Sequence, residues 1–128
     1  MPEPFLMHGK RVPISETLGA EVISRSEGKA TLRYPFMPEY TNPLGQLQGG
    51  MYAVMMDSAM AIAAGGIATA TMQFSIFRPV TSGFLIVTGE VVKQGKTILY
   101  AEAEVRDEEG RLVARGNQNG LPRSAPGS

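Results

Sequence analysis

The chain has 128 residues, with 12 basic and 12 acidic side chains and a formal net charge of zero. This length fits one domain, and the balanced charge does not favour nucleic acid as a partner. The lack of cysteine excludes a thiol nucleophile, a disulfide framework and a thiolate metal site, and the single histidine, His8, excludes a multi-histidine metal site within one chain. Prolines and polar residues interrupt the N-terminus, so we expect no signal peptide and a cytoplasmic protein.

The N-terminal third contains strand and loop signals. Residues 1–17 hold three prolines and no sustained period, which indicates an irregular arm with room for one helical turn. Apolar and polar residues then alternate over 18–36 around turn-forming residues at 26–29, which predicts a β-hairpin. The Pro, Asn and Gly residues of 37–47 predict a loop.

The most apolar stretch, 48–66, opens and closes on glycine pairs. Within 51–64 only Asp57 and Ser58 are polar, and the many Ala and Met residues are strong helix formers. We therefore predict a buried helix over about 49–64. Its apolar part rises only ~21 Å, short of the ~30 Å of a bilayer core, so it is not a membrane span. A second subunit is expected to cover what a sheet leaves bare.

Period-two alternation follows the helix. From Ala68 to Phe77, it places Thr69 and Thr71 on one face of a strand. Further strands are predicted at 84–93, 97–106 and from 111 to about 117, separated by turns at 81–83, 94–96 and 107–110. A polar tail without structure follows from Gly120, with 121–128 expected to be flexible. This order predicts one α+β domain over 1–128, in which an antiparallel sheet wraps around one long helix.

Asp57 needs an explanation, because burying a charge costs several kcal/mol unless the charge is paired or used. On an ideal helix, its side carries mostly small residues, which leave room for another molecule to approach: Gly50, Ala53, Val54, Met60, Ala61 and Ala64. A structural role is the alternative, with Asp57 capping a backbone group or paired with an arginine. The residue alone leaves both roles open.

Polar groups gather where the loop meets the helix. Gly49 and Gly50 lie at the helix N-terminus, where unpaired N–H groups and the helix dipole suit a carbonyl oxygen that becomes negative. Asn42 and Gln48 carry neutral amides that both donate and accept hydrogen bonds. Their alternative roles are turn formation for Asn42 and capping or solvent exposure for Gln48.

The spacing Asn42-x-x-Gly45-x-x-Gln48-Gly49-Gly50, followed by Asp57, resembles the signature of hotdog-fold thioesterases of the phenylacetate-degradation (PaaI-like) branch. Thr69 and the Phe77-Arg78-Pro79 run resemble a later strand of that family, and the similarity covers about 15–119. Two features depart from the family: its usual histidine is Gln48 here, and the passage from helix to strand at 64–68 is short.

The resemblance implies a hotdog fold whose subunits pair edge to edge as a homodimer, often as a dimer of dimers. It implies an active site at the subunit interface, where the acid of one helix meets the Asn and Gly-Gly loop of the partner. The implied reaction is hydrolysis of an acyl-CoA or aryl-CoA thioester without metal or redox cofactor. Asp57 is then the base or nucleophile, the Gly50 N–H polarises the carbonyl, and Asn42 and Gln48 orient the carbonyl or the water.

The remaining expected site residues are substrate-binding: Gly49, Thr69, Thr71 and Arg78, with one of the two threonines holding the lytic water. Two other functions stay open on the sequence. A hydratase or dehydratase of this fold needs a histidine paired with an acid, and no histidine lies in the motif. A non-catalytic module that binds acyl-CoA or aromatic ligands would use Asp57 only to orient its ligand.

Overall fold

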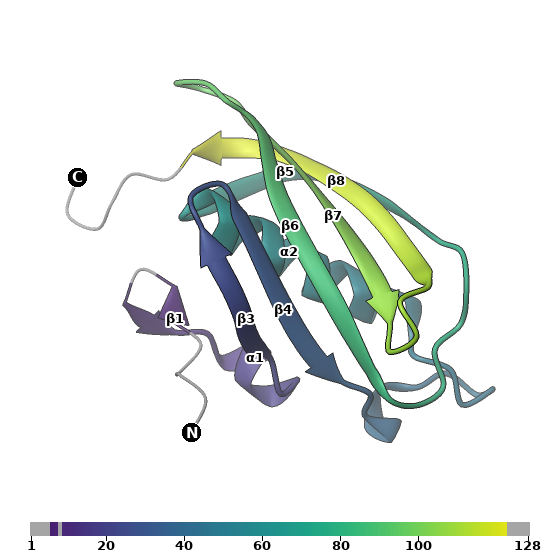
Figure 1. Cartoon of the computed structure of the whole chain (residues 1–128). Helices are drawn as coiled ribbons and strands as arrows, with labels where there is room; N and C mark the ends of the chain where they lie inside the picture. The colour runs from purple at the N-terminus through teal and green to yellow at the C-terminus, as the bar shows by residue number, and fades with distance from the viewer. Residues whose placement is uncertain (1–5, 8, 123–128) are drawn as a thin grey trace.

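One antiparallel sheet curves around one helix, α2 (Gly49–Ala64), in the computed structural model, which describes residues 6–7 and 9–122 (Figure 1). The sheet strands are β3 (Glu21–Ser26), β4 (Lys29–Pro35), β5 (Ile67–Ile76), β6 (Phe84–Gln94), β7 (Leu99–Asp107) and β8 (Leu112–Pro122). Their spatial order is β3-β4-β6-β7-β8-β5, and α2 contacts all six. The predicted α+β architecture is confirmed, as are the helix bounds.

The strand order places β5 at one edge of the sheet. Although β5 follows α2 directly in the chain, it pairs with β8, and no other strand in the described part of the chain pairs with it. Those backbone N–H and C=O groups of this ten-residue strand that point away from β8 are therefore unpaired within the described part of the chain. A long free edge of this kind is a template for pairing with another strand.

The two ends of the chain are more ordered than the sequence predicts. The expected irregular arm contains a short hairpin of β1 (Leu6–Met7) and β2 (Lys10–Arg11) and a helix, α1 (Pro13–Thr17), while His8 lies outside the described residues. Ser15 anchors α1 to the central helix, because it is buried and its hydroxyl lies 3.4 Å from that of Ser58. Beside both serines lies Tyr34, where burial raises the pKa of the phenol to about 12.

At the other end, the predicted tail begins too early. β8 continues to Pro122 because it pairs with β7 on one side and with β5 on the other. Gly120 permits the close approach of β5, since a Cβ there would lie 2.2 Å from the carbonyl oxygen of Ala68. Residues 123–128, the rest of the expected tail, lie outside the described residues.

Another glycine sets the distance between the helix and the sheet. Gly89 of β6 faces α2, and a Cβ at this position would lie 2.5 Å from the carbonyl carbon of Ala59 and 2.7 Å from the nitrogen of Met60. Such distances are below van der Waals contact, so any larger residue would push the helix away from the sheet. The loop between β4 and α2 contains a 3₁₀ helix, Pro38–Tyr40, that the sequence did not indicate.

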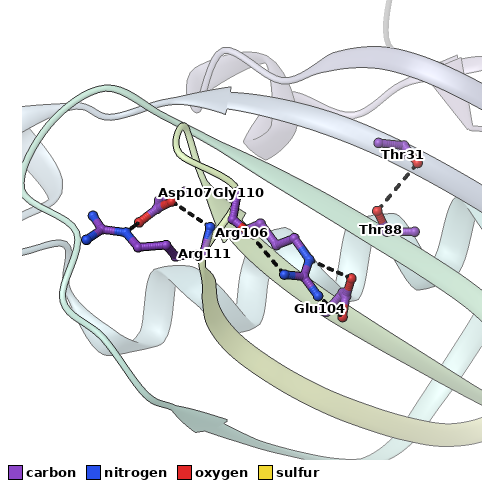
Figure 2. A network of polar contacts seen from close by, with 7 residues as sticks. All are labelled: Thr31, Thr88, Glu104, Arg106, Asp107, Gly110 and Arg111. Carbon is purple, nitrogen blue, oxygen red and sulfur yellow. Dashed lines mark hydrogen bonds and ion pairs between the residues drawn. The ribbon is translucent and has the colours of Figure 1, made fainter.

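The β7–β8 turn is held by one carboxylate. Asp107 Oδ1 accepts hydrogen bonds from the backbone N–H groups of Glu109 (3.0 Å) and Arg111 (2.9 Å). Its Oδ2 accepts one from the Arg111 side chain at 2.7 Å, and Figure 2 shows both contacts with Arg111. Burial by itself raises the pKa of Asp107, but these donors and the positive charge of Arg111 lower it below its ordinary value. The ionised form is thus favoured by folding.

This turn predicts a pH-dependent contribution to stability. Because folding lowers the pKa of Asp107, its carboxylate stabilises the fold fully at pH values above the pKa of an aspartate in the unfolded chain, about 3.9. This contribution is lost as the pH falls through the pKa of Asp107 in the folded protein. We expect Asp107→Asn to lower Tm at pH 7, with the difference from the unmodified protein shrinking below about pH 4. Thermal melts between pH 7 and pH 3 measure this. The control is Glu108→Gln in the same turn; a difference for Asp107→Asn that stayed constant with pH would contradict the assignment.

Candidate active site

The central helix is not covered on all sides by its own chain. Gly50 is exposed and Ala53, Val54, Asp57 and Ala64 are half-buried, so one stripe along α2 stays open. The sheet packs against the other side of the helix, and it buries Met60 completely, although the ideal helix placed that residue on the side of Asp57. Asp57 is half-buried within the single chain, because it lies on the side of α2 that the sheet leaves open, which is the side that a second subunit is expected to cover.

Asp57 is held by a single side chain of the next strand. Thr69 Oγ1, on β5, donates a hydrogen bond to Asp57 Oδ1 at 3.1 Å. No lysine or arginine of the described residues lies within ion-pair distance of this carboxylate. The structural alternative of an arginine partner is therefore not realised within this part of the chain.

A β-bulge aims Thr69 at the helix. Thr69 pairs with Gly120 and Thr71 pairs with Asn119, so Ala70 is an extra residue on β5. Since successive residues of β8 point to opposite faces, Thr69 faces α2 while Thr71 faces the outer surface, where its hydroxyl bonds Asn119. The prediction that both threonines share a face is wrong, and the reason is this bulge.

The loop before α2 is organised by Asn42. Its Oδ1 accepts hydrogen bonds from the backbone N–H groups of Leu44 (2.9 Å) and Gln46 (3.1 Å), while its Nδ2 lies 3.4 Å from Gln46 Oε1. The carbonyl of this amide therefore forms the turn, as in the alternative role. One Nδ2 N–H faces Gln46 Oε1, and the other is the part that remains for a ligand. Backbone hydrogen bonds from Gln48 to Tyr40 and from Leu47 to Val80 fix the end of the loop.

The start of α2 is open. Gln48 is exposed and precedes the helix in an extended conformation, and its side chain does not cap the helix. The N–H groups of the first turn, including those of Gly49 and Gly50, have no partner within an α-helix. Apart from its chain neighbours and the backbone of its own helical turn, no heavy atom of the described residues lies within 4 Å of a Cβ built at Gly50, so packing against the rest of the chain does not require glycine there. The free space and the free donors suit an approaching oxygen.

The two parts of the site are separated along α2. Gly50 and Asp57 share a face, but seven residues at 1.5 Å each place them ~10 Å apart along the axis. Helical N–H groups point toward the N-terminus, so an oxygen bound at Gly50 would lie still farther from Asp57. One chain therefore cannot present both groups to one carbonyl.

Three further observations complete the region. Arg78 is exposed just beyond β5, and no contact joins it to Asp57 or to the Asn42 loop in the described structure. Gln118, which the sequence did not single out, is buried on β8 with its Oε1 3.3 Å from Thr69 Oγ1. The sequence signal that could have indicated Gln118 is the two-residue alternation of β8, which continues beyond Asn117 and places Gln118 on the inward face.

Within residues 6–7 and 9–122, no three His, Cys, Asp or Glu side chains gather as metal ligands.

Over the same described ranges, no helix has both the length and the apolar character needed to cross a membrane.

Comparison with known proteins gives consistent results. The sequence matches the thioesterase superfamily over residues 44–114, more than half of the chain. It is 28% identical to human acyl-coenzyme A thioesterase 13 over 104 residues, covering 74% of each chain. It is 27% identical to the 1,4-dihydroxy-2-naphthoyl-CoA hydrolase of Listeria monocytogenes over 107 residues, covering 78% of this chain and 87% of that protein.

The fold has solved relatives as well. The PaaI protein of the Escherichia coli phenylacetic acid degradation operon superimposes with a TM-score of 0.83 at 24% identity, over 89% of this chain and 86% of that one. At this identity the likeness shows the fold, a sheet wrapped around a central helix. Together with the superfamily match, it establishes that the chain belongs to the thioesterase superfamily and has the hotdog fold of its PaaI-like members.

Proposed function

We propose that the chain hydrolyses an acyl-CoA or aryl-CoA thioester to the free acid and CoA. The observation that carries the proposal is Asp57, a carboxylate on the open stripe of α2 that Thr69 holds and no described cation neutralises. Membership of the thioesterase superfamily supports thioester hydrolysis as the class of reaction. The names of the human and Listeria relatives support a CoA thioester as the substrate.

In the proposed reaction, the Gly50 N–H and the positive end of the α2 dipole stabilise the negative charge that develops on the thioester oxygen. Asp57 takes a proton from water as the water oxygen adds to the carbonyl carbon. The C–S bond then breaks, and the CoA thiolate receives the proton. In the nucleophilic version, a carboxylate oxygen of Asp57 adds to the carbonyl carbon, and the C–S bond breaks to give a mixed anhydride and the CoA thiolate. Water then hydrolyses the anhydride to the free acid and the Asp57 carboxylate, and the proton released from water goes to the thiolate.

The other site residues have supporting roles in this proposal. Thr69 orients the lytic water or the carboxylate, and Asn42 and Gln48 direct their free amide N–H groups toward the substrate carbonyl or the water. Thr71 faces the other side of the sheet, so we assign the water to Thr69. Gly49 gives the acyl group access, and Arg78 binds a CoA phosphate.

The proposed catalytic unit is a homodimer in which Asp57 of one protomer faces the Gly50 N–H of the other. The ~10 Å separation of the two groups along α2 supports a shared site, since one chain cannot apply both to one carbonyl. The free edge of β5 and the open stripe of the helix supply a surface for the second copy, and two dimers can pair further as a tetramer.

The direct test is release of free thiol from a panel of CoA thioesters. The panel should contain aryl-CoAs such as phenylacetyl-CoA and benzoyl-CoA together with medium-chain acyl-CoAs. Turnover of at least one, well above the rate of spontaneous hydrolysis, is the expected result. Tight binding of several members without thiol release would instead support the non-catalytic binding module.

A further inference from the structure

Gln118 is a buried amide whose hydrogen bonding is incomplete. The side chain, on β8, is only 1% exposed and faces α2. Its Oε1 lies 3.3 Å from Thr69 Oγ1, and its buried Nε2 has no hydrogen-bond partner among the described residues. A buried amide N–H without a partner is costly, so this arrangement needs an explanation.

The position of the Thr69 hydroxyl hydrogen suggests an explanation for this arrangement. The Thr69 hydroxyl has one proton, but two acceptor oxygens face it: Asp57 Oδ1 at 3.1 Å and Gln118 Oε1 at 3.3 Å. One proton cannot serve both in full. Rotating the Gln118 amide by 180° exchanges the positions of its oxygen and nitrogen. Nε2 then donates to Thr69 Oγ1 and the Thr69 proton is left for Asp57, so the amide atom without a described partner becomes the carbonyl oxygen instead of the N–H group.

We propose that Gln118 is a positioning residue, whose Nε2–H group donates to Thr69 Oγ1 and thereby directs the Thr69 hydroxyl proton to Asp57 Oδ1. This inference rests on the proposed function, since it concerns the carboxylate assigned to the reaction. The chain of donors fixes Oδ1 of Asp57 and leaves Oδ2 for water or for the thioester carbon.

Local backbone features build this chain of donors. The bulge at Ala70 turns Thr69 inward, and Gly120 lets the backbone of β5 come close at that point, since a Cβ there would lie 3.0 Å from the Thr69 Cα. Neither feature is needed to complete a regular strand pair. Gln118 is two residues from Gly120 on the same inward face of β8, so it meets Thr69.

The test compares Gln118→Met with a matched control. Methionine keeps the length and volume of glutamine but removes the amide, and burying an apolar group avoids a new unsatisfied donor. We expect kcat to fall by about tenfold with KM nearly unchanged, because the lost hydrogen bond acts on Asp57 and not on substrate binding. The control, Asn117→Leu, removes the neighbouring amide on the outer face of β8 and should leave kcat unchanged.

A double-mutant cycle separates positioning from a structural effect. If Gln118 acts through Thr69, the pair Gln118→Met and Thr69→Val should have the kcat of Thr69→Val alone. Effects of the two changes that multiply would overturn the proposal, as would a Gln118→Met enzyme with unchanged kcat.

The hydrogen bond itself can be tested without activity. The side-chain amide resonances of Gln118 should be protected from solvent exchange in ¹⁵N NMR spectra and should shift in Thr69→Val. Unchanged resonances would contradict this inference even in an active enzyme. Conversely, an unmodified protein that releases no thiol from any thioester would contradict only the proposed function, and the NMR result would still decide the donor arrangement.

Discussion

Asp57→Asn is expected to lower kcat by about 10³-fold or more, within the range attributed to a general base and its proton transfer. Asparagine has nearly the same shape as aspartate, but its amide neither accepts a proton at neutral pH nor attacks a thioester. KM should change far less, because the carboxylate acts on the reacting atoms. Steady-state thiol release on the best substrate of the panel measures both quantities.

The same variant should stay folded. Its amide oxygen can accept the Thr69 hydrogen bond, and no described lysine or arginine beside Asp57 would be left without a counter-charge. Tm is therefore expected to hold or rise. A clear fall in Tm with activity retained per folded molecule would show that Asp57 has a structural role, and a stable variant with normal turnover would refute its catalytic role.

Gly50→Pro should have the second-largest effect, a loss of ~10²–10³ in kcat, because proline removes the backbone N–H that polarises the carbonyl. Position 50 lies in the first turn of α2, where a helix tolerates proline because the N–H has no helical partner. The fold should therefore survive, and circular dichroism together with a melting curve can confirm this before kinetics are measured.

Gly50→Ala is the matched variant, because alanine keeps the N–H and adds only a methyl group. Within its own chain that methyl group meets open space. Any loss in Gly50→Ala therefore measures crowding of the substrate or the partner subunit, and the additional loss in Gly50→Pro measures the N–H. Equal activities of the two variants would show that the N–H has no role in the reaction.

Local sequence signals predicted the helix and most of the sheet, because the different signals within each segment indicated the same kind of element. Around 49–64 the flanking glycine pairs, the Ala and Met content and the scarcity of polar residues indicate the same element, and the structure confirms these bounds. The end of β8 was missed because the glycines and asparagines of 116–120 have low strand propensity. Pairing with β5 and β7 overrides that propensity, and such pairing is not readable from the segment itself.

The site was only partly accessible to sequence reasoning. Asp57 could be found because it is a charge in an apolar helix, and the Asn42 loop because its spacing matches a family pattern. The bulge at Ala70 has no local signature, since alternation continues through it in the sequence and only the register with β8 reveals it. Gln118 looked like one polar residue in a polar segment, and its burial depends on the closing of the sheet around α2.

The central claim is that Asp57 of one protomer and Gly50 of its partner act on the same thioester. Mixing Asp57→Asn and Gly50→Pro subunits tests it most directly, after co-expression with two different affinity tags. A shared site predicts that each mixed dimer contains one intact site and one doubly altered site. A random mixture should therefore recover about a quarter of the normal activity, from two subunit preparations that are each nearly inactive alone. Mixed dimers isolated through both tags that remain as inactive as their parents would contradict the claim.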